Sequence, residues 1–369
     1  MGRPRVQRIA HNGASVGGVG YRWRSAKQLA GLIDTVAGAT WFEHDTRGCL
    51  TAALRPDGSV QYRTPDAVGN IYRSADRTDR MYGKGGRIET AGSVRYVHDA
   101  DGQLVEKLSA DGDVWKYAWD FAGQLVEVTR PDSQRVRFAY DALGRRVYKS
   151  FAASTTRYVW DGNDLVHELG EGAEAVTWVF EPGTFAPLAK IEGERRYGLV
   201  TDHLGTPRMM ADEAGALAWK GQLDVYGVAR NDVRVTTCLW RWPGQYEDEE
   251  TGLYYNRFRY YDPAAGRYVS QDPIRLAGGL SLYAYTSDPL TLVDPSGLAG
   301  CRFTKDQAAL VGVANDVERT GVTRGEADIL RQWASETGLP FRGPEVHPGR
   351  PFGQFPHIHV GPIDHIRVK

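Results

Sequence analysis

The sequence predicts a mainly β protein made of stacked β-hairpins, followed by a small α+β unit at the carboxyl end. Three observations support this fold class. The 369 residues include 43 glycines and 19 tyrosines, a composition typical of many turns and amphipathic strands. A unit that reads aromatic-Asp-x-x-Gly, followed by an apolar residue, recurs in the amino-terminal half. After Leu298 this unit disappears and apolar residues take helical spacing.

The repeat has a period of 21 residues and occurs in two runs. Each copy is predicted to be a β-hairpin, and stacked copies give a continuous twisted sheet with aromatic side chains packed between neighbours. These aromatic residues are therefore expected in the core rather than on a sugar-binding surface. The positions in register are Leu29, Leu50 and Ile71; Asp45 and Asp66; Gly48 and Gly69; Asp99, Asp120 and Asp141; and Gly102, Gly123 and Gly144. Trp119, Tyr140 and Trp160 each precede an aspartate.

Two Asp-Gly steps lie between alternating segments, at Asp57-Gly58 and Asp111-Gly112. Such a step predicts a hairpin with a two-residue turn, because the turn needs positive φ and glycine accepts it freely.

The bulk composition excludes several classes. A formal charge of -1 does not favour whole-chain attraction to nucleic acid or anionic lipid. Cys49, Cys238 and Cys301 are too far apart for a CxxC metal site and too few for a disulfide framework. No signal peptide and no transmembrane segment are expected, since no apolar run is long enough. We therefore expect a protein that is cytoplasmic in its producer and is exported by separate machinery.

Motifs of a different kind replace the strict repeat from Val200 onward. They include DHLGTPR, PGQYEDEETGLYYNRFRYYDP, DPIRLAGG and DPSGL. Together with the YD repeats, they resemble the core of rearrangement hotspot (RHS) proteins, which are similar to the C subunits of Tc toxin complexes. The resemblance covers roughly residues 20 to 298. It implies a hollow β-shell, a plug formed by the end of the core, and an enclosed carboxy-terminal toxin.

This chain has about a dozen hairpins, fewer than family members use to close a shell. We therefore expect a curled sheet or partial shell with open edges. The expected division is a YD-repeat hairpin array over residues 1–199, an RHS core-associated domain over 200–298 and a variable carboxy-terminal domain over 299–369.

The Asp-Pro steps at Asp272 and Asp294 allow two interpretations. Aspartates before proline are common turn residues. Alternatively, two carboxyl groups in an apolar setting share a proton, one acting as a base toward water and the other as an acid toward the leaving group. The resemblance implies the second: an intramolecular aspartyl protease with this dyad, with Arg259 as a supporting residue, that cuts between Leu298 and Ala299.

Two further Asp-Pro aspartates, Asp262 and Asp288, lie outside the positions that the resemblance matches. They are expected to be turn residues only.

The sequence of residues 299–369, here called the tail, predicts two helices. The first follows Thr304 as N-cap and ends near Gly321. The second begins near Thr323, which forms a capping box with Glu326, and the segment at residues 338–340 ends it. Its apolar face is formed by Ala327, Leu330, Trp333 and Ala334.

Four of the nine histidines fall within the last 23 residues. In a strand, His357 and His359 project from one face about 7 Å apart, while the intervening apolar residues face the other way. If the chain turns back at Gly361-Pro362, His365 and Arg367 join the same polar face.

Three interpretations of this face remain open. A metal-independent ribonuclease would use two of His357, His359 and His365 as base and acid, and Arg367 to stabilise the phosphorane. Alternatively, His357 and His359, with His347 or His365 and with Glu345, bind a divalent metal that activates water. Thirdly, the histidines only satisfy hydrogen bonds on a strand surface. No other cofactor is expected.

The position of the tail after DPSGL resembles the place where RHS proteins carry interchangeable toxins, many of them nucleases. The expected function is a carrier that cuts itself and releases a small nuclease for interbacterial competition. Expected partners are a cognate immunity protein on the tail, secretion machinery such as a type VI system or its adaptor, and nucleic acid as substrate. The alternative is a non-enzymatic surface or interaction protein with an inert tail.

Overall fold

The computed structural model describes residues 4–11, 14–25, 28–275, 279, 281–298, 322–337, 341–346, 356–360 and 363–368. Antiparallel sheets dominate it, and the prediction of a mainly β protein is confirmed. Within these ranges no helix has both the length and the apolarity that a membrane crossing requires.

The first sheet has six strands in sequence order, each paired with the next. A two-stranded sheet follows it, formed by β7 (Thr64–Pro65) and β8 (Ile71–Tyr72). The six strands are β1 (Val6–His11), β2 (Ala14–Ser25), β3 (Gln28–Asp34), β4 (Gly38–His44), β5 (Leu50–Leu54) and β6 (Val60–Tyr62).

The second sheet has sixteen strands, again paired strictly in sequence order. A short 3-10 helix, η1 (Lys84–Gly86), lies between its first two strands. The strands are β9 (Arg80–Tyr82), β10 (Ile88–Ala91), β11 (Val94–His98), β12 (Leu104–Leu108), β13 (Val114–Trp119), β14 (Leu125–Thr129), β15 (Arg135–Tyr140), β16 (Arg146–Phe151), β17 (Ser154–Asp161), β18 (Asp164–Gly170), β19 (Val176–Phe180), β20 (Pro187–Glu192), β21 (Arg195–Thr201), β22 (Pro207–Asp212), β23 (Leu217–Leu223) and β24 (Ala229–Arg234).

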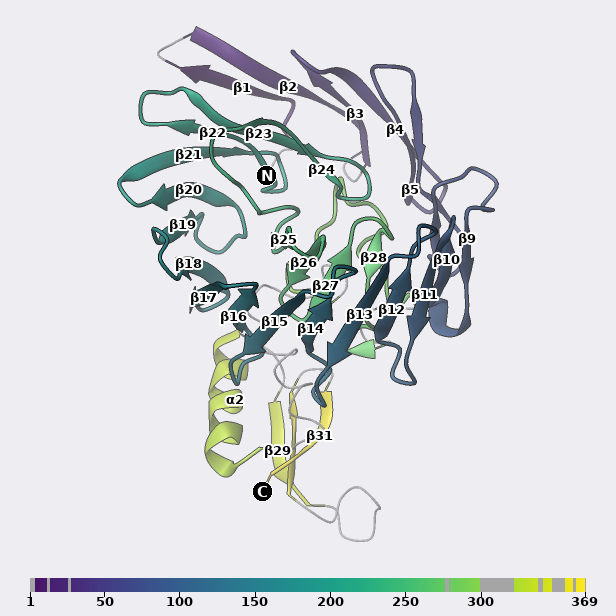
Figure 1. Ribbon diagram of the computed structural model, residues 1–369, viewed down its shortest axis with the longest axis vertical. Coiled ribbons are helices and arrows are strands. Elements are labelled where there is room, and N and C mark those ends of the chain that lie inside the picture. The colour runs from purple at the N-terminus through teal and green to yellow at the C-terminus, as the bar shows by residue number, and fades with distance from the viewer. Residues whose placement is uncertain are drawn as a thin grey trace.

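The two sheets curl around a common interior without closing (Figure 1). At the meeting point the contacts are made by side chains rather than by strand pairing: Gln7 donates to the carbonyl of Thr201 at 2.7 Å, and Arg208 lies 3.3 Å from Asp34. The expected partial shell with open sheet edges is therefore confirmed.

The repeat turns share one geometry, which the turn at Asp120 illustrates. Its Oδ1 accepts the N–H groups of Ala122 and Gln124, each at 2.9 Å, and Gly123 has a φ of 83°. The aspartate closes the turn and the glycine tolerates its left-handed backbone, so the motif specifies a tight reversal.

The aromatic residue before the aspartate joins successive strands of the sheet. In three repeats its side chain donates a hydrogen bond to the first residue of the preceding strand, which ties the end of one strand to the start of its neighbour. The donors and carbonyl acceptors are Trp119 and Leu104, Tyr140 and Leu125, and Trp160 and Arg146, at 2.8, 2.6 and 2.8 Å.

Hairpins form at both predicted Asp-Gly steps, but their loops hold three residues rather than two. At the first, the Arg55 N–H donates to the Ser59 carbonyl at 2.9 Å, and the Gly58 N–H donates to the Arg55 carbonyl at 3.0 Å. The same two bonds surround Gly112. The predicted loop length was wrong because each glycine takes the left-handed position of a bulged three-residue loop.

The hairpins continue after the sequence motif weakens. Asp202 and Asp224 form the same turn, with the N–H groups of Thr206 and Val228 donating to their Oδ1 atoms at 3.0 and 2.9 Å. The expected boundary between residues 199 and 200 falls within β21, and the three-part division of the chain stays a prediction.

A four-stranded inner sheet lies inside the curl (Figure 1). Its strands are β25 (Tyr246–Asp248), β26 (Leu253–Asn256), β27 (Arg259–Asp262) and β28 (Arg267–Tyr268), and nearly every residue in them is buried. Apolar side chains of this inner sheet and of β14 and β15 share one core. The sheet of sixteen strands, here called the wall, therefore packs directly on the inner sheet, which together with the segment that follows it to Leu298 is here called the plug.

The tail is an α+β unit, as predicted. The helix α2 (Arg324–Thr337) begins with the expected capping box: the Thr323 N–H donates to Glu326 at 2.7 Å, and the Glu326 N–H donates to the Thr323 hydroxyl at 3.3 Å. The sheet has the order β29 (Phe341–Glu345), β30 (His357–Val360) and β31 (Ile363–Arg367). The first predicted helix, after Thr304, lies outside the described residues.

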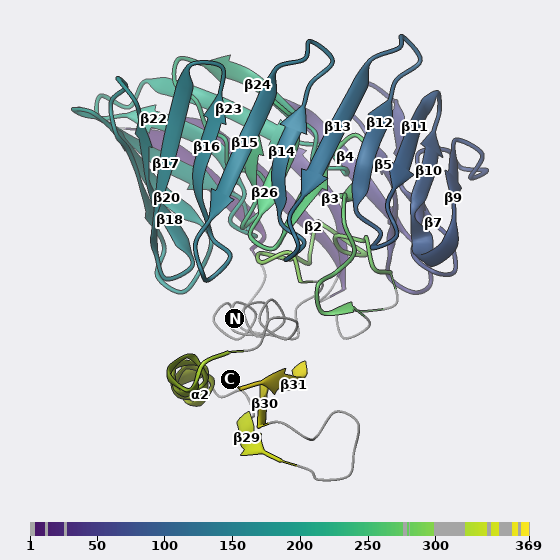
Figure 2. The same cartoon turned by 60° about the horizontal axis from the view of Figure 1, so that its bottom comes forward.

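Figures 1 and 2 both place α2 and the three tail strands beyond one end of the curled sheets. The tail core of Leu330, Ile358 and Ile366 continues into Ile274 and Leu298 of the plug. The resemblance implied an enclosed tail, and the structure differs: the described part of the tail covers the end of the plug from outside.

Candidate functional site

Asp272 and Asp294 meet at one buried guanidinium. The Nη2 atom of Arg259 lies 3.2 Å from Asp272 Oδ2 and 3.1 Å from Asp294 Oδ2. All three residues are at most 3% exposed. The structure thus brings together the three residues that the resemblance identified as a self-cleavage site.

Each aspartate also serves as a turn residue through its other oxygen. Asp272 Oδ1 accepts the N–H of Ile274 at 3.0 Å, and Asp294 Oδ1 accepts the N–H of Leu298 at 2.9 Å. The two interpretations of these residues are therefore compatible, because one oxygen shapes the chain while the other faces Arg259.

The guanidinium is held from three sides. Its Nη1 donates to the Leu282 carbonyl at 3.1 Å, its Nε donates to the Gly297 carbonyl, and its carbon lies 3.6 Å from the centre of the Tyr268 ring. A cation held in this way has no freedom to leave, so it fixes the separation of the two carboxyl groups.

The two carboxyl groups differ in their environment. Burial raises the pKa of Asp272 to about 6, against the opposing charge of Arg259 and together with that of Asp294. Its Oδ2 has no well-aligned hydrogen bond within the described ranges, whereas Asp294 Oδ2 also accepts the Tyr268 hydroxyl at 2.9 Å. Asp272 is thus the partner that can carry a proton near neutral pH.

The segment from Pro295 to Leu298 packs closely against the backbone of other segments. Gly297 has a φ of 72°, and a Cβ there would lie 2.5 Å from the Asn256 carbonyl oxygen. A Cβ on Gly244 would lie 2.0 Å from the Pro295 carbonyl oxygen. Close approach at both glycines delivers Leu298, which is 2% exposed, to the aspartates. Ala299, the other side of the predicted cut, lies outside the described residues.

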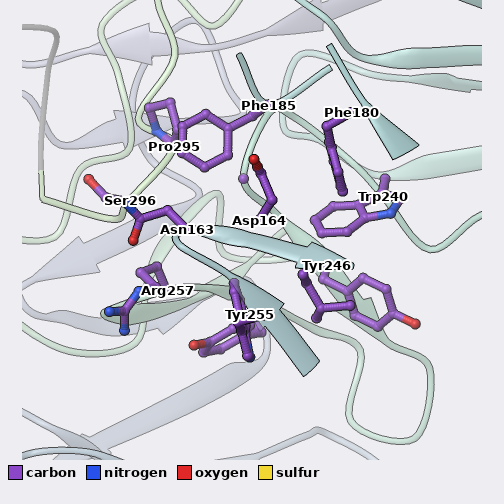
Figure 3. Close-up of a pocket in the computed structure, with 13 residues that line it drawn as sticks. Asn163, Asp164, Phe180, Phe185, Trp240, Tyr246, Tyr255, Arg257, Pro295 and Ser296 are labelled. Carbon is purple, nitrogen blue, oxygen red and sulfur yellow. The ribbon is translucent and has the colours of Figure 1, made fainter. Parts of the chain in front are cut away.

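A small aromatic cavity lies beside Pro295 and Ser296 (Figure 3). Phe185 and Trp240 are among the residues that line it, and its volume is about 20 Å³. That volume holds about one water molecule, so this cavity packs the segment from Pro295 to Leu298 and does not accommodate a ligand.

Two residues of this site were missed by the sequence reasoning. Tyr268 donates to Asp294, and the Asn256 side chain donates to the Asp294 carbonyl at 2.9 Å and to the Tyr268 hydroxyl. Asn256 lies within the motif PGQYEDEETGLYYNRFRYYDP and Tyr268 follows it by five residues, and no spacing in this stretch points to Asp294.

The expected turn residues behave as such. Asp262 Oδ1 accepts the N–H of Ala264 at 2.8 Å, and Asp288 Oδ1 accepts the N–H of Leu290 at 3.0 Å. Asp288 also pairs with His44 at 3.2 Å, away from the Arg259 cluster.

The tail forms a second cluster. Glu345, His357 and His359 each offer one ligand atom, and these atoms all lie within 4.8 Å of one another. The two histidines are 2% and 6% exposed, with ring centres 5.2 Å apart. Ile358 and Val360 are fully buried on the opposite face, as the strand alternation predicted.

Arg342 is the member of this cluster that the sequence reasoning missed. It lies opposite His359 in the register of β29 and β30. Its Nη2 is 3.3 Å from His359 Nε2, and its Nε is 2.9 Å from Glu345 Oε1. A hydrogen bond to this nitrogen requires the tautomer of His359 with the proton on Nδ1.

The remaining predicted residues are only partly placed. Arg367 is exposed and lies opposite His357 in the register of β30 and β31. His365 lies in β31, although its side chain is outside the described residues, and His347 is outside them entirely. Neither the ribonuclease interpretation nor the metal interpretation is decided by these positions.

Comparisons with known proteins support this architecture. The teneurin YD-shell family model matches residues 32–286. Double-stranded DNA deaminase toxin A of Burkholderia cenocepacia is 34% identical over 325 residues, covering 77% of this chain and 23% of that protein. Toxin protein Tse5 of Pseudomonas aeruginosa is 34% identical over 352 residues, covering 76% and 27%.

A third relative, probable deoxyribonuclease RhsB of Dickeya dadantii, is 36% identical over 362 residues, covering 81% of this chain and 25% of the relative. The chain thus spans about a quarter of the length of these relatives. The crystal structure of TcdB2-TccC3 matches with a TM-score of 0.59 and 18% identity, covering 77% of this chain and 17% of that one, and this likeness concerns the fold.

The sequential hairpins, the Asp-x-x-Gly turns and the matched family model lead to one assignment. The resemblance to RHS proteins is confirmed, and the chain belongs to the teneurin YD-shell family of YD-repeat proteins.

Proposed function

We propose that this chain belongs to a polymorphic toxin that cuts itself between Leu298 and Ala299. The observation that carries the proposal is the double role of Asp294: its Oδ1 holds the Leu298 N–H at 2.9 Å, and its Oδ2 meets Asp272 at Arg259. The residue before the cut is thereby tied to the dyad itself.

The chemistry assigns a different role to each carboxyl group. Ionised Asp294 takes a proton from a water molecule as that water attacks the Leu298 carbonyl carbon. Protonated Asp272 gives its proton to the nitrogen of Ala299 as the carbon–nitrogen bond breaks, leaving a new carboxyl group and a new amine. The cut works in cis because folding holds this bond at high effective concentration.

The test is expression of the full chain with Asp272→Asn or Asp294→Asn. Both variants keep a similar shape at the site and should remain uncut on a denaturing gel, whereas the wild type separates into two pieces. Asp262→Asn is the matched control, because this aspartate is also buried and accepts the N–H two residues along the chain, but its ion pair is with Lys107 rather than with Arg259. Equal cutting in all four proteins would contradict the proposal.

The tail is proposed to be the toxic part, a small nuclease delivered to competing cells. Support comes from the buried histidine pair, which lies beside Arg342 and Arg367 and offers either acid–base groups or metal ligands, together with cations suited to a phosphodiester. The name of one relative, probable deoxyribonuclease RhsB, points to a nuclease, and that of another, a double-stranded DNA deaminase toxin, points to nucleic acid as the target. An immunity protein that binds the tail, and export by a type VI or related system, belong to the same proposal.

Expression of the full chain in a bacterium tests the toxic role. Growth arrest with degraded RNA or DNA should occur with the wild type and should vanish with His357→Ala or His359→Ala. Growth without nucleic-acid damage would favour the alternative, a YD-repeat interaction protein with an inert tail.

A further inference from the structure

We propose that Glu345, His357 and His359 bind one divalent transition-metal ion, and that Arg342 occupies the ion's place until the ion arrives. The inference does not depend on self-cleavage or on nuclease activity, since it concerns only the ligand of this cluster. It keeps Glu345, His357 and His359 from the ligands that the sequence suggested and adds the role of Arg342, while His347 lies outside the described residues.

The first argument is the donor set. Two imidazoles and one carboxylate are the ligands of many zinc sites with an open fourth position, whereas Mg²⁺ and Ca²⁺ prefer oxygen alone. The three donor atoms lie within 4.8 Å of one another. Donors around a shared tetrahedral Zn²⁺ lie roughly 3.4 Å apart. Side-chain rotations that move the donor atoms by about 1 Å therefore complete the site.

The second argument is the rigidity of the support. Both histidines lie on β30, the central strand of the tail sheet, with hydrogen-bonded neighbours on both sides. Ile358 lies between the two histidines and Val360 follows them, and both are fully buried on the side that packs against the helix. Neighbouring imidazoles on such a strand keep their separation, which lowers the cost of organising a metal site.

The third argument is the position of Arg342. Its guanidinium contacts two of the three proposed ligands, at 2.9 Å from Glu345 and 3.3 Å from His359. A positive charge is therefore already drawn to the point where these acceptors converge. The Arg342 side chain is 66% exposed, so it can turn into solvent when a doubly charged ion replaces it.

The replacement of Arg342 by the metal ion requires no transfer of a proton. The ion takes lone pairs from two neutral imidazole nitrogens and one ionised carboxylate, and Arg342 leaves still protonated. No bond is broken. Arg342 and the exposed Arg367 lie opposite His359 and His357 on the neighbouring strands, so the bound ion would be flanked by positive charge that suits an anionic ligand.

The experiment is calorimetric titration of ZnCl₂ alone into the full chain, with CoCl₂ absorption as a second readout. One ion per chain should bind, with the visible absorption of four-coordinate Co²⁺. Glu345→Gln and His359→Ala should each weaken binding by about 100-fold or more. His167→Ala is the control, because this half-buried histidine lies on β18 and bonds to Thr177, remote from the cluster.

Arg342→Ala decides the matter even if a histidine variant fails to fold. Removing the competing cation from an exposed position should tighten Zn²⁺ binding by about threefold to tenfold. Weaker binding in this variant would overturn the proposal. So would the lack of one-to-one binding in the wild type, or binding that Glu345→Gln and His359→Ala leave unchanged.

Discussion

The aspartate site of the plug and the histidine site of the tail are built alike, since in both a guanidinium joins titratable side chains. They differ in how far that guanidinium is exposed to solvent. Arg259 is 1% exposed and is held by two carbonyls and a tyrosine ring, whereas the Arg342 side chain is 66% exposed. A cation that cannot leave fixes one geometry, whereas a cation that can leave makes room for a ligand.

The largest expected effect is that of Arg259→Met. Two buried carboxyl groups lose their common partner, which should lower the free energy of unfolding by about 3–5 kcal/mol and stop self-cleavage. Denaturant unfolding and a denaturing gel measure the two effects.

Arg342→Met is the matched change in the tail. The pair that it removes is exposed to solvent, so the free energy of unfolding should change by less than about 1 kcal/mol. Equal losses from the two arginine variants would break the comparison between the sites.

Gly297→Ala should slow self-cleavage by about 100-fold. The new Cβ would lie 2.5 Å from the Asn256 carbonyl oxygen, so the chain must shift and carry Leu298 away from Asp294. The rate is measured by refolding the uncut chain from denaturant and sampling it on a gel.

Gly252→Ala is the control for this change. Gly252 has a similar φ of 70° but no atom within 4 Å of its Cβ position, so its variant has the backbone strain without the displacement. A slow rate in this variant as well would assign the effect to general destabilisation.

The rate of self-cleavage should fall about tenfold per pH unit above pH 6, because Asp272 must supply a proton and its pKa is raised to about 6. The contribution of Asp272 to the stability of the fold also falls as the pH rises. A raised folded-state pKa stabilises the fold fully below the unfolded value near 4, and this contribution is lost as the pH rises through about 6. Refolding at a series of pH values gives the profile, and a rate that rises from pH 6 to pH 8 would contradict the assignment of roles.

Trp119→Phe should affect only the sheet, because it removes the bond to the Leu104 carbonyl at 2.8 Å and leaves the aromatic ring in place. We expect a loss of about 1 kcal/mol in the free energy of unfolding of the wall, with unchanged self-cleavage. Slower cleavage in this variant would show that the site depends on the wall more strongly than its own contacts indicate.

Short sequence patterns predicted much of the fold because each one determines the structure of its own segment. The Asp-x-x-Gly unit shapes its own turn, as Asp120 shows, and the alternation around Ile358 placed the histidines on one face. The loop length at Gly58 was missed, since both turn types accept glycine at positive φ.

The rest depended on contacts between distant segments. Tyr268 looked like every other core tyrosine until the fold carried Asp294 to its hydroxyl. Arg342 became part of the histidine cluster only through the register of β29 against β30, which no spacing within either strand reveals.

The most direct test of the central claim is the mass of the two pieces from the purified wild-type chain, with Asp294→Asn beside it. The account predicts one new carboxyl end at Leu298 and one new amino end at Ala299 in the wild type, and an intact chain in the variant. A wild type that stays whole after folding, or a cut at another bond that survives Asp294→Asn, would contradict it.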